Sequence, residues 1–496
     1  MGVIETQAIR KSIVQYIALV VGFLGTYFVY NKYNQFYGLS SVLIDAAVLL
    51  STFMTLGVAS LSIRYFPEFK DTNNSRSAFF TFLVSIACLG ISLSFLVFFS
   101  FKDSIVPFLS NDDDPLFEAF ILWSFPLAIL ISFRNLLSNY VTNYKKIVIN
   151  GVANSLFHKT ALPLIILTAV YMSWSFKTYV LAVFGMFAAI ILILFTYIMS
   201  LDKIRIVSFK PYVNREKLKD MAIFAFYGLF GSLGTFLATK IDTIFVAKYV
   251  DVASSGTYKV MSYFATLLEV PYMSILGIAA PIVASKLQED DIKGVRSIYH
   301  KSSQVLTIVG FGVLLGIALN ATDLFNIMPK KETTDVSMAF FVVLCLGCAR
   351  LVDASTSINT HIIIYSKYFR FNFYSILILS VINISLNYML VPKYGMRGVA
   401  IATLASIFLF NLVKIIYVKM KFDLWPFTKV SVIVFLIGIS SFLLIYFIPL
   451  NFHPVINIAI RCICIAVLYL LPLYLLGYLD EIISNIWKQV KKILGQ

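Results

Sequence analysis

Long apolar stretches recur along the whole chain and are separated by short polar segments. A helix of about 20 apolar residues is long enough to cross the hydrocarbon core of a bilayer. Stretches of this length predict fourteen transmembrane helices, over residues 12–31, 40–63, 79–100, 116–133, 150–172, 178–200, 221–246, 256–283, 303–320, 338–360, 371–391, 398–418, 430–448 and 457–478. The pattern therefore predicts an all-α polytopic membrane protein.

The composition excludes an ordinary soluble protein. Hydrophobic residues make up 59% of the 496 residues and charged residues only 13%, against about 25% charged in an average soluble domain. The mean hydropathy is +0.87. The five cysteines lie inside apolar stretches, where they resemble small hydrophobic side chains, so we expect neither disulfides nor a bound metal.

The net charge of +15 is best explained by membrane topology. With the N-terminus inside, cytoplasmic segments hold 26 of the 40 Lys and Arg residues, the opposite side holds 8, and the spans hold 6. The positive-inside rule then predicts that both termini are cytoplasmic, beside anionic membrane lipids. No basic stretch is long enough for a folded nucleic-acid-binding module, so nucleic acid is not an expected partner.

A basic segment divides the spans into six before it and eight after it. It covers residues 201–220 and contains Lys203, Arg205, Lys210, Arg215, Lys217 and Lys219. The predicted organisation is an N-lobe, a cytoplasmic linker, a C-lobe, and two further spans with a cytoplasmic C-terminal tail, over residues 1–200, 201–220, 221–418 and 419–496. The sequences Tyr37-Gly38 and Gly256-Thr257-Tyr258 open similar helices in the two halves, which hints at the internal repeat common among transporters.

Ionisable residues inside the spans are the candidate functional residues, because a charge in hydrocarbon is costly unless it faces protein or water. Lys259, Ser262, Thr266 and Glu269 follow at helical spacing and share one face of the eighth span. Glu269 lies near the predicted membrane midplane. It is either a protonatable residue lining a cavity or a hydrogen-bonded packing residue.

The tenth span carries a second polar face, formed by Arg350, Asp353, Ser357 and His361. Arg350 and Asp353 are one turn apart and can pair within the helix. Such a pair needs no ligand, and the alternative is that Arg350 binds a diphosphate.

The other candidates are spread over both halves. Asp242 lies in the seventh span near Lys240, Asp45 in the second span, and Lys159 beside His158 in the fifth. Arg64 and Arg134 lie at cytoplasmic helix ends, where they either anchor the topology or bind phosphate oxygens through the guanidinium fork.

Two sequence patterns resemble a known family. Residues 383–403, NISLNYMLVPKYGMRGVAIAT, are similar to the eleventh-to-twelfth helix turn of the multidrug/oligosaccharidyl-lipid/polysaccharide (MOP) exporter superfamily. Residues 10–13, 37–39 and 64–69, which read RKSI, YGL and RYFPEF, resemble its polysaccharide branch, the O-antigen and capsule flippases. Within residues 383–403, Pro392 and Gly395 permit a tight turn, and the small residues after that turn permit close helix packing.

This resemblance implies a V-shaped bundle of two six-helix lobes, with the last two spans outside that core. It implies a flippase in the bacterial plasma (inner) membrane that moves a polyprenyl-diphosphate-linked oligosaccharide to the outer leaflet by alternating access. Glycan polymerase and glycosyltransferases of the same pathway are then expected partners. Arg64, Arg134, Lys159, Lys259 and Arg350 are the candidates for substrate binding.

The charges do not decide between the function classes that remain. A drug exporter of the same fold is the main alternative, since four deep cations are matched by the carboxylates Asp45, Asp242, Glu269 and Asp353. A glycan-joining enzyme is disfavoured because no outward loop is long enough to carry catalytic residues. No Gly-rich nucleotide loop or cofactor motif is present, so we expect a proton or sodium gradient as the drive. Glu269 is the first candidate to couple it, because Arg350 would hold Asp353 ionised.

Overall fold

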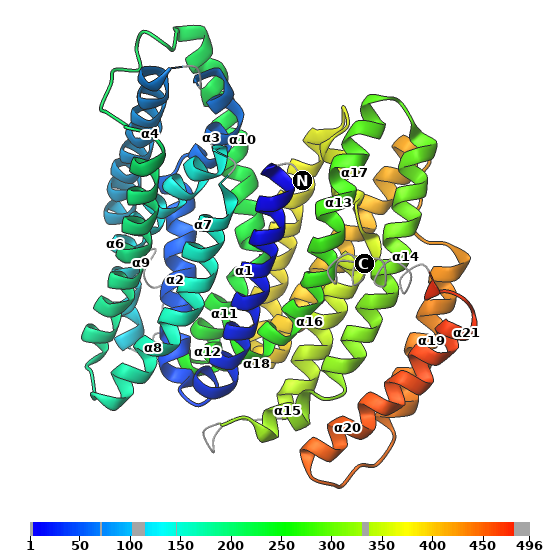
Figure 1. The fold of residues 1–496 in the computed structure, drawn as a ribbon. Coiled ribbons are helices and arrows are strands. Elements are labelled where there is room, and N and C mark those ends of the chain that lie inside the picture. Colours follow the sequence, from blue (N-terminus) through cyan, green and yellow to red (C-terminus); the bar gives the residue numbers. More distant parts are fainter. Residues whose placement is uncertain (1–2, 70–71, 102–114, 145, 330–336, 481–496) are drawn as a thin grey trace. The chain divides into compact units, whose positions relative to one another are not determined.

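The computed structural model describes residues 3–69, 72–101, 115–144, 146–329 and 337–480, and the described elements are all helical (Figure 1). The expected C-terminal tail beyond residue 480 lies outside them. The described residues form two compact units. Unit 1 runs to Lys259 and includes Pro329, and unit 2 begins at Val260.

Unit 1 is a bundle in which α2 packs along α6 and α6 packs along α9. Its elements are α1 (Val3–Gly25), η1 (Thr26–Tyr30), α2 (Asn34–Met54), α3 (Val58–Tyr65), η2 (Phe66–Phe69), α4 (Asn73–Ser100), α6 (Pro115–Asn143), α7 (Ile147–Gly151), η3 (Val152–Phe157), α8 (His158–Tyr171), α9 (Phe176–Leu201), α10 (Arg215–Thr239), α11 (Ile241–Tyr249) and the first half of α12 (Val252–Ala265).

Unit 2 is built around α14, α16 and α18, which pack on one another. After the second half of α12 its elements are η4 (Thr266–Leu268), α13 (Glu269–Gln288), α14 (Ile292–Ala318), α15 (Ala321–Ile327), α16 (Ser337–Thr356), α17 (Asn359–Ile364), α18 (Phe369–Phe422), α19 (Lys429–Tyr446), α20 (Pro454–Ile465), η5 (Ala466–Leu470) and α21 (Leu471–Leu475).

The predicted all-α polytopic fold is confirmed. Among the described residues, eleven helical segments are long and apolar enough to cross a membrane. One of them, α18, covers two of the predicted spans, 371–391 and 398–418. The number fourteen stays a prediction.

Several predicted spans are broken where the chain cannot continue a regular helix. The predicted span 256–283 is interrupted by the 3-10 turn η4, immediately before Glu269. Pro271 explains this break, because it lacks the N–H that would bond one turn back and its ring clashes with that carbonyl. The predicted span 338–360 is likewise divided into α16 and α17 at Ser357, whose φ is +53°.

Two glycines allow α2 and α12 to cross in direct contact within unit 1. A Cβ atom on Gly38 would lie 1.9 Å from the carbonyl oxygen of Val252, and one on Gly256 would lie 2.2 Å from that of Asn34. The side chain of Asn34 donates a hydrogen bond of 3.1 Å to Thr257 at the same crossing. The two similar sequences noted above therefore pack against each other.

We expect Gly38→Ala to destabilise the protein by about 1–3 kcal/mol, the usual cost of forcing an extra methyl group into a packed contact. The clash is with backbone, so no side chain can move aside. The measurement is the apparent melting temperature of the purified protein in detergent. Gly185→Ala in α9 is the matched control, since a Cβ there meets no atom within 4 Å; equal melting temperatures for the two variants would contradict the expectation.

The predicted turn of residues 392–395 is present as a sharp reversal within α18. Gly395 adopts φ +54° and ψ −135°, a conformation that is open to glycine and strained for other residues. Phe371 and Tyr417 stack with their ring centroids 3.5 Å apart, so the two halves of α18 lie side by side. The chain also packs closely at the turn, which explains why residue 398 is a glycine: a Cβ atom on Gly398 would lie 2.5 Å from the carbonyl oxygen of Leu390.

The segment predicted as a linker is shorter than the range 201–220. It follows α9 without regular structure to Asn214, whose side chain accepts a hydrogen bond of 2.8 Å from the amide of Lys217 and so caps α10. Arg215, Lys217 and Lys219 therefore belong to the first turns of α10. Good helix formers directly after an Asn cap explain the early start.

Candidate functional site

Unit 1 contains a buried ion pair between helices that are far apart in sequence. Lys259 on α12 is paired with Asp45 on α2, and its ammonium also lies 3.5 Å from the hydroxyl of Thr243 on α11. Asp242, next to Thr243, accepts a hydrogen bond of 3.1 Å from Tyr258. Three candidates from separate predicted spans, Asp45, Asp242 and Lys259, thus meet in one polar cluster.

A group of basic side chains lies in the same unit, and two of its members, Arg134 and His158, carry a buried nitrogen that has no hydrogen-bond partner in the described residues. The Arg134 guanidinium donates one hydrogen bond of 2.8 Å to Asn135, but its buried Nε has no partner among the described residues. The buried Nδ1 of His158 likewise has none. The positive charges of Arg134, Lys159 and Lys259 lie near enough to His158 to act on it electrostatically, and we call these four side chains the basic cluster.

The local helix geometry brings these groups together. The stretch Val152–Phe157 is a π-helix, placed directly before His158 and inside the predicted fifth span. Segments of π-helix are rare in proteins, and those that occur often lie at functional sites. Asn150 and Asn154 precede His158 at steps of four residues and bond the hydroxyl of Ser138 on α6, the second of them at 3.1 Å. A row of polar side chains from α6, α7 and η3 therefore leads toward the basic cluster.

Arg64 is held in a different way. It lies in the last turn of α3, is exposed, and its guanidinium carbon is 4.3 Å from the ring centroid of Phe224 on α10. Within the described ranges it makes no ion pair. Both roles considered above, topology anchor and phosphate ligand, stay open for this residue.

Unit 2 contains its own cluster of charged residues. Arg350 on α16 lies 3.0 Å from a carboxylate oxygen of Glu269 and 3.8 Å from one of Asp353. The amide of Asn411 on α18 donates a hydrogen bond of 2.6 Å to Asp353. A small cavity of about 60 Å³ adjoins the cluster, lined by Glu269, Arg350 and Asp353 together with Leu268, Tyr272 and Met273.

Glu269 was preferred over Asp353 as the ion-coupling residue because Arg350 was expected to pair with Asp353 alone, and the structure does not support that reason. We expected Arg350 to pair with Asp353 along one helix, but its closer contact is Glu269, from another helix. Arg350 is therefore shared by both carboxylates. The predicted polar face of Lys259 and Glu269 is also divided, because the two residues find their partners in different units.

Lys414 is a buried cation that is not among the residues predicted from the sequence. Its side chain is 1% exposed, its ammonium donates a hydrogen bond of 2.9 Å to Thr360, and it lies 3.8 Å from the ring centroid of Phe410. The charge of Lys414 acts on Asp353 and on His361, whose buried Nδ1 has no hydrogen-bond partner in the described part of the chain. Asn411 and Lys414, three residues apart in an apolar span, were the signal that could have found this site.

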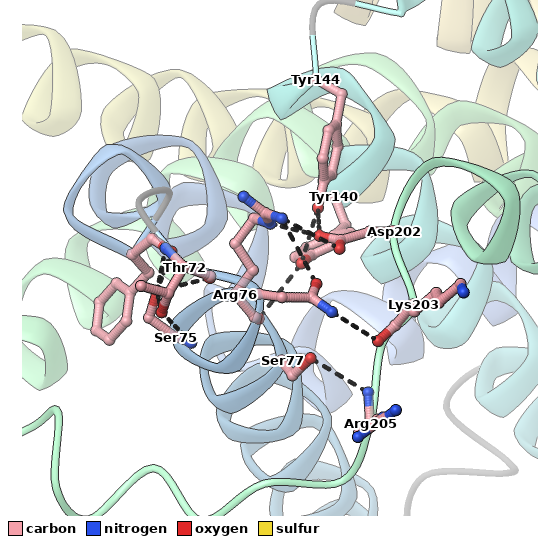
Figure 2. Close-up of polar contacts among 11 residues, drawn as sticks. Thr72, Ser75, Arg76, Ser77, Tyr140, Tyr144, Asp202, Lys203 and Arg205 are labelled. Carbon is pink, nitrogen blue, oxygen red and sulfur yellow. Dashed lines mark hydrogen bonds and ion pairs between the residues drawn. The ribbon is translucent and has the colours of Figure 1, made fainter.

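A third polar cluster holds the start of the linker on α4. The Arg76 guanidinium binds the Asp202 carboxylate with two contacts of 2.5 and 3.3 Å, and Tyr144 donates a hydrogen bond of 2.6 Å to the same carboxylate (Figure 2). Burial and the bond to Asp202 raise the pKa of Tyr144, so its hydroxyl stays protonated and donates. The linker amide of Arg205 then bonds Ser77, as Figure 2 also shows. This cluster is structural.

No set of three His, Cys, Asp or Glu side chains close enough to hold a metal ion occurs in the described part of the chain. The cysteines are free. The charged clusters are therefore the candidate functional sites of the two units.

The chain matches one family over more than half its length. Residues 11–287 match the family described as polysaccharide biosynthesis protein. Over 92% of its length the chain is 23% identical to the uncharacterized membrane protein MJ1068 of Methanocaldococcus jannaschii, covering 91% of that protein. Over 36% of its length it is 26% identical to the probable flippase AglR of Haloferax volcanii, covering 38% of that protein.

Solved structures share the fold at low sequence identity. The lipid II flippase MurJ in an inward closed conformation is 16% identical with a TM-score of 0.74, and the match covers 96% of this chain and 100% of that one. An inward-facing multidrug resistance MATE family transporter of the MOP superfamily is 13% identical with a TM-score of 0.60, over 83% of this chain and 94% of that one.

These findings define a multi-pass membrane protein whose fold is that of the MOP superfamily transporters. The chain belongs to the polysaccharide biosynthesis protein family. The family match confirms the predicted polysaccharide branch, and the solved structures confirm the fold predicted from the MOP superfamily. The bacterial inner membrane and the orientation of the termini stay predictions.

Proposed function

We propose that this transporter flips a polyprenyl-diphosphate-linked oligosaccharide across the membrane, from the cytoplasmic to the outer leaflet. The observation that carries the proposal is the basic cluster of Arg134, His158, Lys159 and Lys259 in unit 1. Within this cluster Lys259 is paired with Asp45, whereas the buried Nε of Arg134 has no hydrogen-bond partner among the described residues. A buried guanidinium nitrogen without a hydrogen-bond partner is costly unless a ligand supplies one.

A diphosphate fits this need better than a neutral sugar or a cation would. It offers several negatively charged oxygens, and Arg134 can bind two of them through its fork. His158 adds a ring N–H donor, which a neutral imidazole also carries. In this proposal the polar row of Ser138, Asn150 and Asn154 leads toward the same place and offers hydrogen-bonding groups to the sugars.

The proposed drive is an ion gradient acting through the charged cluster of unit 2. Glu269 and Asp353 share the single guanidinium of Arg350 beside a small cavity. Two carboxylates around one cation can exchange a proton or a small cation at lower cost than an isolated buried carboxylate. This supports cation coupling at Glu269, with Asp353 as the second carboxylate.

A cation-coupled drug exporter is the second candidate function. The carboxylates of unit 2 and the shared fold with a MATE transporter favour it. The basic cluster of unit 1 opposes it, because a lipophilic cation would be repelled by Arg134 and Lys159. We therefore prefer the lipid-linked oligosaccharide.

A deletion strain that lacks any second flippase tests the proposal with the native substrate. We expect lipid extracts to show an accumulated lipid-linked oligosaccharide and the surface glycan to be lost, because the precursor stays on the cytoplasmic leaflet. A plasmid copy should reverse both effects. Normal surface glycan without accumulated precursor, together with raised sensitivity to lipophilic cations, would instead assign the drug-exporter function.

A further inference from the structure

Unit 1 contains an apolar groove that takes no part in the charged clusters. It has a volume of about 310 Å³ and lies between α3, α4 and α10. Leu61 of α3, Phe82 and Ile86 of α4, and a row of α10 side chains form its walls, and its described lining is entirely apolar. The row on α10 runs from Leu218 through Ala222 to Leu229.

The groove is open on one side. Leu218 is 44% exposed and Phe226 is 56% exposed, whereas Leu61 and Phe82 at the inner wall are buried. An empty groove would leave these walls without partner atoms and so forfeit dispersion contacts. In a membrane the available filling is a hydrocarbon chain.

The length of the groove fits a chain that belongs to one leaflet. From Leu218 to Leu229, a helical rise of 1.5 Å per residue gives about 16 Å. This is close to half of the hydrocarbon core, which is about 30 Å thick. An ordinary membrane lipid chain occupies that depth, whereas a polyprenyl chain is longer than one leaflet is deep.

Basic residues border the linker end of the groove. Arg215 precedes Leu218 by three residues and Ala222 by seven, so it shares their face of α10, and Lys219 lies one turn further along. Both side chains are exposed, and neither forms an ion pair with the described residues. The linker is held at this end too, because the ring of Phe209 packs 5.1 Å from that of Phe82.

We propose that this groove binds one hydrocarbon chain of an anionic membrane lipid, whose phosphate is held by Arg215 and Lys219. Apolar contact alone cannot select a lipid, because the surrounding chains are equally apolar. Selectivity comes from the two cations, which favour a negative headgroup. The site is separate from the basic cluster of Arg134, whose residues lie on other helices and do not line the groove.

Binding of phosphatidylglycerol and phosphatidylcholine with identical chains to the purified full-length protein tests this proposal. Native mass spectrometry or a fluorescence titration in detergent gives the two dissociation constants. We expect phosphatidylglycerol to bind about 30-fold more tightly, the effect of two cations near the headgroup. Arg215→Gln combined with Lys219→Gln should remove this preference, and Lys177→Gln on the exposed start of α9 should not.

Filling the groove provides the second comparison. Ala222→Trp should weaken the binding of both lipids, whereas Ala188→Trp, on an exposed alanine of α9 outside the groove, should leave it unchanged. Melting temperatures verify that the variants are folded. If the double variant of Arg215 and Lys219 unfolds, the single variant Arg215→Gln replaces it in the lipid comparison. Equal affinity for the two lipids, or equal behaviour of the two Trp variants, would overturn the proposal. Displacement of phosphatidylglycerol by an equimolar polyprenyl diphosphate would also overturn it, by assigning the groove to the transported lipid.

Discussion

Arg134→Gln should lower flipping about 10- to 100-fold at sub-saturating substrate while leaving the melting temperature unchanged or raised. The loss corresponds to one or two charge-assisted hydrogen bonds to the diphosphate. Stability should not fall, because the buried Nε of Arg134 has no hydrogen-bond partner in the described residues and the partners shown for its guanidinium are uncharged: the amide of Asn135 and the ring of Phe187, whose centroid is 5.4 Å away. Removing a poorly matched buried charge relieves a desolvation cost.

The measurement combines complementation of the deletion strain, at verified expression, with the melting temperature of the purified variant. Arg134→Lys should recover only part of the activity, since lysine keeps the charge but loses the fork. Arg296→Gln is the control, because that arginine is exposed and pairs with the exposed Asp423. If Arg134→Gln instead lost stability and activity together, the residue would have a structural role and the diphosphate proposal would lose its main support.

Local features of the sequence were sufficient to predict an all-helical polytopic membrane protein and the tight turn of α18. Apolar length determines a membrane helix whatever its neighbours are, and Pro392 with Gly395 breaks a helix through backbone chemistry alone. The interruption before Glu269 follows from Pro271 in the same way. These predictions concern interactions within a few residues, where the sequence is informative.

The charged clusters could not be predicted in this way, because their partners lie on different helices. Asp45 and Lys259 are 214 positions apart, and nothing in their local spacing marks them as a pair. Asp202 lies within the predicted linker range, and nothing in its local sequence marks it as the partner of Arg76 and Tyr144. Local spacing also suggested the wrong dominant partner for Arg350, since the i to i+3 pair with Asp353 is the longer of its two contacts.

The second large effect is expected at Glu269. Glu269→Gln should fold and should flip substrate at the rate seen without a gradient, but should no longer respond to an imposed proton or sodium gradient. In the Glu269→Gln variant Arg350 still has Asp353 as a partner, so the two opposite charges remain paired and the variant should be stable. Glu269→Asp should retain a partial response because it keeps the titratable carboxylate.

Asp353→Asn provides the sharpest comparison, because both carboxylates contact Arg350 but only one also faces Asn411 and the charge of Lys414. Removing the charge of Asp353 weakens the hydrogen bond from Asn411 and takes away a negative charge that acts on the buried ammonium of Lys414, so we expect a loss of about 1–3 kcal/mol in stability. We expect no such loss in Glu269→Gln. Flipping in proteoliposomes with the membrane potential clamped at zero, together with melting temperatures, separates the two residues. A full gradient response in Glu269→Gln would move coupling to Asp353, if its variant is folded and unresponsive, or to the buried Asp45 and Asp242 of unit 1.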